Sequence, residues 1–107
     1  MKPTIDDAGS ARAFAALGNE TRLRILRLLV KTGSRGLNVG DLQRLTEVPA
    51  STLAHHLATL AQAGVVRQEK HGREVLNFAD YASLRRISGY LLEDCCAGVL
   101  EAAGEAA

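Results

Sequence analysis

The sequence contains few cysteine, proline and aromatic residues. Of its 107 residues, two are cysteine, two are proline, none is tryptophan and 4% are aromatic. The two cysteines, Cys95 and Cys96, are adjacent in the sequence. Because a disulfide between neighbouring residues is strained, we do not expect the structural disulfides that cross-link small secreted domains. No apolar run approaches the roughly 20 residues needed to cross a membrane, and the start of the chain has no apolar signal segment. We therefore expect a cytoplasmic protein with free thiols and no membrane contact.

The sequence also lacks the local motifs of common enzymes. It has no P-loop, no glycine-rich dinucleotide turn, no His-Glu-x-x-His run and no nucleophile elbow. Adjacent thiols could suggest an arsenate reductase or a disulfide oxidoreductase, but those enzymes use a separated cysteine pair or a phosphate-binding loop. We therefore expect a protein that is not an enzyme and that requires no cofactor.

The composition is that of one soluble globular domain, with 47% hydrophobic and 23% charged residues. The net charge of +1 does not by itself indicate a nucleic-acid binder. A specific DNA-binding protein, however, needs its basic groups on one face more than it needs a high total charge. We expect a single domain over residues 1–107, with residues 1–5 and 100–107 flexible.

Helix start and stop signals divide the chain into short elements. Asn19, Asn38 and Asp80 are good N-cap residues, and Asp41 completes a capping box with Asn38. The spacing of apolar residues predicts helices over 6 or 7–17, 20–31, 39–45, 50–63 and 81–97. The second helix has an apolar arc too wide for a surface helix, which predicts a central core helix. In the third helix, Val39, Leu42 and Leu45 are expected to face inward.

Between the last two predicted helices the pattern changes from helical to alternating. Residues 65–70 and 73–78 are compatible with strands and flank His71 and Gly72, which predicts a hairpin with a two-residue turn at these positions. The chain is therefore expected to be mainly α with a small β-hairpin, in the order α-α-α-α-β-β-α. A helix pair with a tight turn, followed at once by a basic hairpin, is typical of a winged helix-turn-helix.

The fourth predicted helix has the character of a DNA-reading helix. Leucines stack on one side of it, and the opposite side has small and hydrogen-bonding groups without a carboxylate, which suits entry into a major groove. The hairpin adds cations that can contact the phosphate backbone. The candidate DNA-binding residues are Ser51, Thr52, His55, Thr59, Arg67, Lys70, His71 and Arg73.

Each feature alone has a simpler interpretation, because polar residues opposite leucines form any solvated helix face and a basic hairpin is also a soluble turn. It is the two together, in this order, that favour double-stranded DNA as the partner. His56 lies towards the leucine side of the helix and is expected to be a hydrogen-bonded packing residue. Arg24, Arg27 and Lys31 are expected to form a solvated stripe on the second helix.

Residues 15–78 resemble the ArsR/SmtB family of bacterial metalloregulatory repressors. The stretches that carry the resemblance are ALGNETRLRILRLL at 16–29, LNVGDLQRL at 37–45, STLAHHLATLAQAGVV at 51–66 and HGREVLNF at 71–78. The resemblance implies a homodimer, paired through its first and last helices, that represses transcription from an imperfect palindrome and dissociates when an effector binds.

The sequence departs from family members at the common metal sites. Asn38 and Gly40 stand where some members have cysteines, and the last predicted helix has no histidine, which other members use with aspartate to bind zinc. Ala54 stands where many relatives have serine, which removes one potential hydrogen bond to DNA.

Cys95 and Cys96 are the candidate effector ligands, because soft thiolates suit thiophilic ions. Arsenic(III) and antimony(III) usually take three sulfur ligands, whereas a methylated arsenic(III) needs two, so a small thiol or the partner subunit would complete an inorganic site. The hypothesis is a trivalent arsenical, arsenite or methylarsenite. The alternatives are a thiol-based redox or persulfide sensor, a buried pair of small apolar residues, and a winged helix used only for protein contact. Zinc is the effector that this cysteine pair fits least, because a zinc site usually has four ligands.

Overall fold

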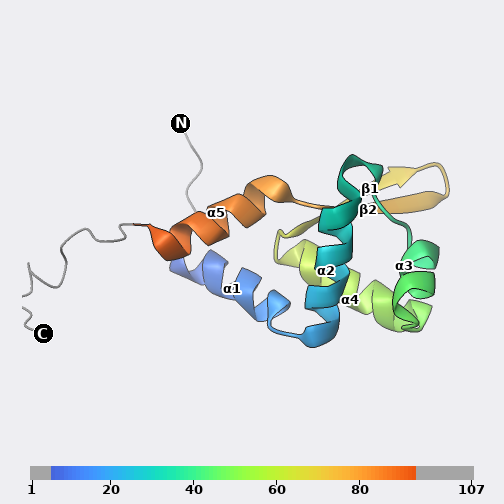
Figure 1. Cartoon of the computed structure of the whole chain (residues 1–107), viewed down its shortest axis with the longest axis horizontal. Coiled ribbons are helices and arrows are strands. Elements are labelled where there is room, and N and C mark those ends of the chain that lie inside the picture. Colours follow the sequence, from blue (N-terminus) through green and yellow to red (C-terminus); the bar gives the residue numbers. More distant parts are fainter. Residues whose placement is uncertain (1–5, 94–107) are drawn as a thin grey trace, which may run out of the picture.

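The computed structural model describes residues 6–93 and confirms the expected winged helix-turn-helix order (Figure 1). Its elements are α1 (Asp7–Leu17), α2 (Glu20–Thr32), a 3-10 helix (Gly33–Arg35), α3 (Val39–Thr46), α4 (Ala50–Gln62), β1 (Val66–His71), β2 (Glu74–Ala79) and α5 (Tyr81–Leu92). Helices α1 and α5 lie side by side at one end of the molecule, and α3, α4 and the hairpin lie at the other. Within residues 6–93, no helix is long and apolar enough to cross a membrane.

Side-chain caps begin the helices where the sequence predicts them. The Asn19 side chain accepts from the backbone N–H of Arg22 at 3.0 Å, which starts α2. Asn38 and Asp41 form the expected capping box, in which each side chain accepts from the other residue's backbone N–H. Each such cap stabilises a helix by about 1 kcal/mol, so these helix starts are set by local chemistry.

The core forms where α2, α3 and α4 meet. Its fully buried side chains include Ile25 and Leu29 of α2, Leu42 of α3, and Leu53, Leu57 and Leu60 of α4. The predicted apolar side of α4 is therefore confirmed.

The predicted burial of two other helices is partly wrong. Leu23 and Val30 of α2 are 44% and 41% exposed, and Leu45 of α3 is 52% exposed. The reason is that α1, α4 and β2 cover α2 on one side, so a single protomer does not bury its whole apolar arc.

The hairpin differs from the prediction by one residue. The strands pair antiparallel with Arg67 opposite Phe78 and His71 opposite Glu74, so the turn consists of Gly72 and Arg73 rather than His71 and Gly72. Gly72 has φ 65°, and Arg73 is not among the residues with positive φ. Glycine at the first turn position suits a type II′ turn, whereas the sequence pattern predicts glycine at the second turn position.

Asn77 joins the hairpin to the segment between α2 and α3. It is fully buried, and its backbone exchanges hydrogen bonds of 2.8 and 3.0 Å with the backbone of Leu37. Its side-chain nitrogen donates to the Leu37 carbonyl at 3.0 Å, and its side-chain oxygen accepts from Gln68 Nε2 at 2.8 Å. Strand β2 thus lies between β1 and Leu37, which fixes the hairpin to the helical core.

Helix α5 ends earlier than predicted. Its last residue is Leu92, and Glu93 leaves the helical conformation with ψ 138°. Ile87 is buried against the core, whereas Leu91 and Leu92 are 65% and 72% exposed. The predicted continuation to residue 97 is therefore wrong at Glu93, and Cys95 and Cys96 lie outside the described residues.

Candidate nucleic-acid interface

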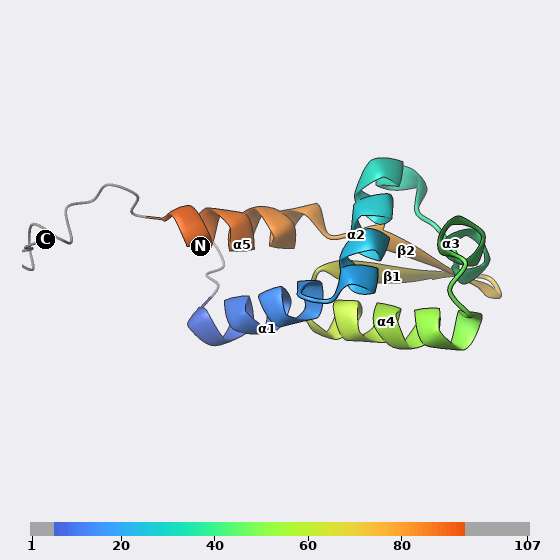
Figure 2. The same cartoon turned by 60° about the horizontal axis from the view of Figure 1, so that its bottom comes forward.

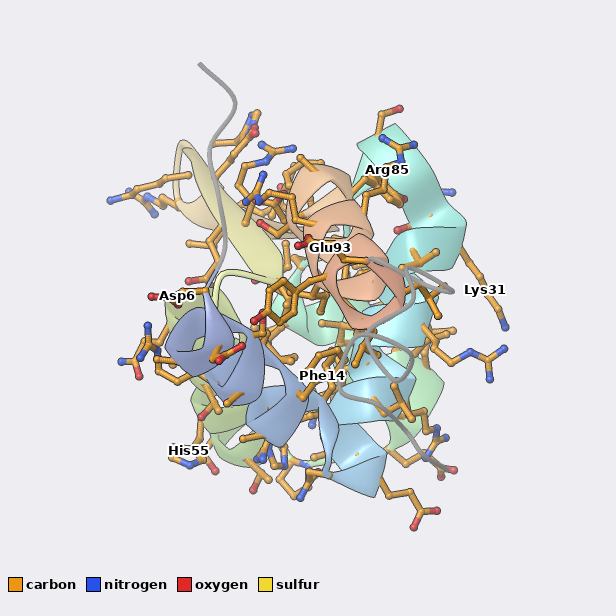
Figure 3. The ribbon with its side chains drawn as sticks, turned by 90° about the vertical axis from the view of Figure 1, so that its left-hand side faces the viewer. Asp6, Phe14, Lys31, His55, Arg85 and Glu93 are labelled. Atoms are coloured by element: carbon orange, nitrogen blue, oxygen red, sulfur yellow. The ribbon has the colours of Figure 1, made fainter. Side chains whose placement is uncertain are left out.

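Helix α4 and the hairpin present their polar side chains on one side of the molecule. In Figure 3, which looks along the long axis from the α1 and α5 end, His55 of α4 and the hairpin lie at the left. Lys31 of α2 lies at the opposite edge. A duplex placed against the left side of this view would therefore meet the helix and the hairpin together.

The outward face of α4 combines small and hydrogen-bonding groups. Ser51, Thr52 and His55 are exposed, as are Ala54 and Ala58 between them. Residues 50–62 include no carboxylate, so nothing on this helix repels phosphate. The first turn also has no side-chain cap, because Pro49 stands at the N-cap position, which leaves backbone N–H groups and the positive end of the helix dipole for an anion.

Thr59 contributes less to this face than the other three predicted residues of α4. It is half-buried, and its hydroxyl donates a hydrogen bond to the carbonyl of His55 at 3.1 Å. That bond uses the only proton of the hydroxyl, so Thr59 can offer an outside partner only its lone pairs.

The predicted cations of the hairpin do not form one cluster. Arg73 lies in the turn and Lys70 lies close to it. Both are exposed, and neither forms an ion pair with any residue between 6 and 93. His71 Nε2 lies 3.2 Å from Glu69 Oε1. Arg67 lies near the base of the hairpin, where it pairs with Glu69 and its guanidinium carbon stands 4.7 Å from the centre of the Phe78 ring.

The strand pleat explains this separation. Successive residues of a strand point to opposite faces, so Arg67 and His71 share one face with Glu69, and Lys70 lies on the other. Glu69 therefore neutralises part of the positive charge that the sequence predicts for the hairpin. The cations near the turn with no acidic partner in the described part of the chain are Lys70 and Arg73.

Two side-chain contacts that position the hairpin and α4 join residues far apart in the chain, and no sequence pattern predicts them. Asn38 Nδ2 donates to Glu74 Oε1, so the residue that caps α3 also holds the hairpin. Arg22 Nε donates to the Ala16 carbonyl at 2.7 Å, and its Nη1 lies 3.4 Å from His56 Nδ1. Arg22 thereby links the end of α1 to the middle of α4.

The environment of His56 keeps its ring neutral. Burial, the positive charge of Arg22 and the neighbouring His55 together lower the pKa of His56 from its ordinary value of 6.5. Because a guanidinium can only donate, Nδ1 must accept the hydrogen bond, which places the ring proton on Nε2. The expected role of His56 as a hydrogen-bonded packing residue is confirmed.

Within residues 6–93, no three His, Cys, Asp or Glu side chains are grouped so that they could hold a metal ion. Asn38, one of the two positions at which the resemblance to ArsR/SmtB proteins would allow a cysteine, is the cap of α3. The predicted effector ligands Cys95 and Cys96 lie outside the described residues.

Comparison with known proteins assigns this arrangement to a family. A helix-turn-helix domain model matches residues 17–69, which contain α2, α3 and α4. An ArsR-like transcriptional regulator from Rhodococcus sp. RHA1 superposes with a TM-score of 0.71 and 34% identity, covering 84% of this chain and 81% of that one. This chain belongs to the ArsR-like family of winged helix-turn-helix transcriptional regulators. As an ArsR-like protein it is a regulator of transcription and not an enzyme.

Two further likenesses concern the same ArsR-like fold. A candidate arsenical resistance operon repressor of Halobacterium salinarum is 39% identical over 60 residues, which are 56% of this chain and 46% of that protein. The homodimeric winged helix-turn-helix domain of a candidate ArsR-family regulator from Mycobacterium bovis has a TM-score of 0.64 and 24% identity, with coverage of 89% and 93%. At that identity the second likeness concerns the fold alone.

Proposed function

We propose that this ArsR-like regulator is a homodimeric repressor that binds two-fold symmetric operator DNA through α4 and the hairpin. The observation that carries the proposal is the position of a carboxylate-free helix face on the same side of the molecule as the hairpin. A helix of this character reads base edges in the major groove, while cations on a neighbouring hairpin contact phosphates and fix the register.

Each exposed residue has a role set by its position. Ser51 and Thr52 lie in the first turn of α4, where hydroxyl and backbone donors suit a phosphate. His55 stands one turn further along and reaches a base edge, while Ala54 and Ala58 permit close approach. Lys70 and Arg73 contact the backbone in the adjacent groove.

A dimer is supported by the apolar surface that a single protomer leaves uncovered. Leu91 and Leu92 at the end of α5 are 65% and 72% exposed. Ala11 and Ala15 of the adjacent α1 are also exposed. Exposed apolar surface of this kind is typical of an interface, and two-fold pairing would set two α4 helices about 34–36 Å apart, one turn of DNA. The homodimeric Mycobacterium bovis domain has the same fold.

The proposed effector is a trivalent arsenical, arsenite or methylarsenite, ligated by Cys95 and Cys96. The chemistry of the donor set supports it, because two adjacent thiolates are soft ligands and a methylated arsenic(III) needs two sulfurs. Cys95 stands three residues beyond the last residue of α5 in the sequence, so ligation there would act on the proposed dimer helices and alter the spacing of the two α4 helices. The name of the Halobacterium salinarum relative points to the same class of effector.

Fluorescence anisotropy with DNA from upstream of the gene tests the DNA-binding part of the proposal. The wild-type chain should bind in a sequence-selective, salt-sensitive manner. A chain that binds all duplexes equally, or none, would contradict the repressor function and favour a winged helix used for protein contact.

Titration of the preformed complex tests the effector. Arsenite or methylarsenite should release DNA from the wild type and not from Cys95→Ser/Cys96→Ser, while zinc should release neither. Release that survives both substitutions would exclude the cysteine pair as the sensor. Release by peroxide or persulfide alone would establish the redox alternative instead.

A further inference from the structure

A hollow of about 280 Å³ opens between α1 and α4, beyond the C-terminal end of the helix surface that carries Ser51, Thr52 and His55. Three alanines contribute small side chains to its wall. The longer residues around it are Arg12, Arg22, Thr59 and Gln62. No carboxylate lines the hollow, and two of its four longer side chains are guanidinium groups, so its chemistry suits an anion.

The guanidinium groups at this hollow retain unused hydrogen-bond donors. A guanidinium has five N–H groups. Arg22 directs one N–H to the Ala16 carbonyl and one to His56, and its other three N–H groups have no partner in the described part of the chain. Arg12 is exposed and forms no ion pair with any residue between 6 and 93. Planar, multiply donating groups of this kind bind phosphate well.

The hollow lies beside the surface that carries the DNA-binding proposal. In Figure 2, α1 and α4 run along the same lower edge of the molecule, with α1 beneath α5 and α4 beneath the hairpin. Thr59 and Gln62 belong to α4 itself, one and two turns beyond His55. In the proposed dimer, α1 lies between α4 and the two-fold axis. A duplex bound by both α4 helices would therefore lie over this hollow in the stretch of DNA between α4 and the two-fold axis.

We propose that this hollow receives a phosphate of the operator backbone, bound by Arg12 and Arg22, between the DNA-reading helix and the centre of the operator. The contact rests on the proposed DNA-binding function and extends it to α1. Because a phosphate carries no sequence information, the contact adds affinity and fixes the orientation of α4 without reading bases. It also places a phosphate ligand on Arg22, the residue that links α1 to α4.

Arg12→Gln tests the contact, because Arg12 is exposed and its loss leaves the core intact. Arg27→Gln is the matched control, since Arg27 is also an exposed arginine in the middle of a helix and lines a different hollow on α2. Operator affinity is measured by anisotropy over a series of salt concentrations. Arg12→Gln removes one phosphate contact from each protomer of the proposed dimer, so the magnitude of the slope of log K against log salt should fall by about 1.8, with binding weakened to all duplexes alike. The control should keep the wild-type slope.

The outcomes separate this inference from the proposed function. Equal slopes for Arg12→Gln, Arg27→Gln and wild type, with binding retained, would overturn the phosphate contact alone. A wild-type chain without salt-dependent DNA binding would remove the repressor function and the contact with it. A third arm uses DNA-free protein with inorganic phosphate at matched ionic strength. If phosphate raises the melting temperature of wild type and not of Arg12→Gln, while the DNA slopes are equal, the hollow binds the free ion and the backbone contact is wrong.

Discussion

Arg22 and His56 connect two helices with different tasks, because Nη1 of Arg22 lies 3.4 Å from Nδ1 of His56. Arg22 lies in the first turn of α2 and donates a hydrogen bond to the Ala16 carbonyl at the end of α1, whereas His56 lies on α4 next to the exposed His55. The contact requires a neutral imidazole, since a protonated ring would have no acceptor for the guanidinium and would repel it. Protonation of His56 would therefore remove this link between the end of α1 and the middle of α4.

We expect stability to fall as the pH decreases below 6.5. The pKa of His56 is lowered in the folded chain by burial, by Arg22 and by His55, so the unfolded chain binds more protons between that lowered pKa and 6.5. The stabilisation is complete above pH 6.5 and is lost as the pH falls through this window. Urea unfolding of wild type and His56→Gln at pH 7.5 and 5.5 measures the difference. His56→Gln should be less dependent on pH, and His55→Gln should retain most of the dependence, because burial is the largest cause. Equal pH dependence in wild type and His56→Gln would refute the assignment.

Asn77→Ala should lower the free energy of unfolding by about 1–3 kcal/mol, because it leaves the Leu37 carbonyl and Gln68 without a side-chain partner at a fully buried position. Gln68→Ala is the control, since Gln68 is exposed and its truncation leaves only the side-chain oxygen of Asn77 without its hydrogen-bond donor. Chemical denaturation measures both. A loss for Asn77→Ala no larger than that for Gln68→Ala would contradict the view that Asn77 anchors the hairpin.

Two substitutions of Asn38 separate its roles as cap and as hairpin contact. Asn38→Ala removes both and should cost about 1 kcal/mol or more of stability. Asn38→Ser keeps a capping oxygen but cannot donate an amide N–H to Glu74. We therefore expect Asn38→Ser to remain close to wild type in stability and to bind operator more weakly, because the hairpin is less well held. Loss of stability without loss of DNA affinity would assign Asn38 to capping alone.

His55→Ala should weaken operator binding by about 1–3 kcal/mol and reduce the preference for operator over other DNA, as expected for a residue that reads a base edge. Arg73→Ala should weaken binding to every duplex alike, as expected for a phosphate contact. Competition anisotropy with operator and random duplexes distinguishes the two patterns. If His55→Ala lowers both affinities equally, the histidine contacts only the backbone.

Leu91→Ser/Leu92→Ser should shift the protein from dimer to monomer and weaken operator binding. These leucines are 65% and 72% exposed in one protomer and have an apolar surface to bury against a partner. Leu45→Ser is the control, because Leu45 is 52% exposed on α3, away from α1 and α5. Sedimentation velocity measures the shift. A double variant that stays dimeric would place the dimer interface elsewhere.

The sequence by itself determined the order of the elements and most of their starts. Asn19, Asn38 and Asp80 cap helices through hydrogen bonds to residues three positions away, so the required partner is always present in the local sequence. The leucines of α4 and its carboxylate-free opposite face follow from helical periodicity alone. The family resemblance and the DNA-binding interpretation rest on these local features.

The tertiary structure decided which side chains are covered and how the interface is held. Arg22 and His56 are 34 residues apart, Asn38 and Glu74 are 36 apart, and Leu37 and Asn77 are 40 apart, so periodicity carries no information about these contacts. The strand register placed Arg67 over Phe78 and apart from the hairpin tip. The exposure of Leu23 and Leu45 likewise depends on where neighbouring helices stop, because burial is a property of the packed molecule and not of the helix that carries the residue.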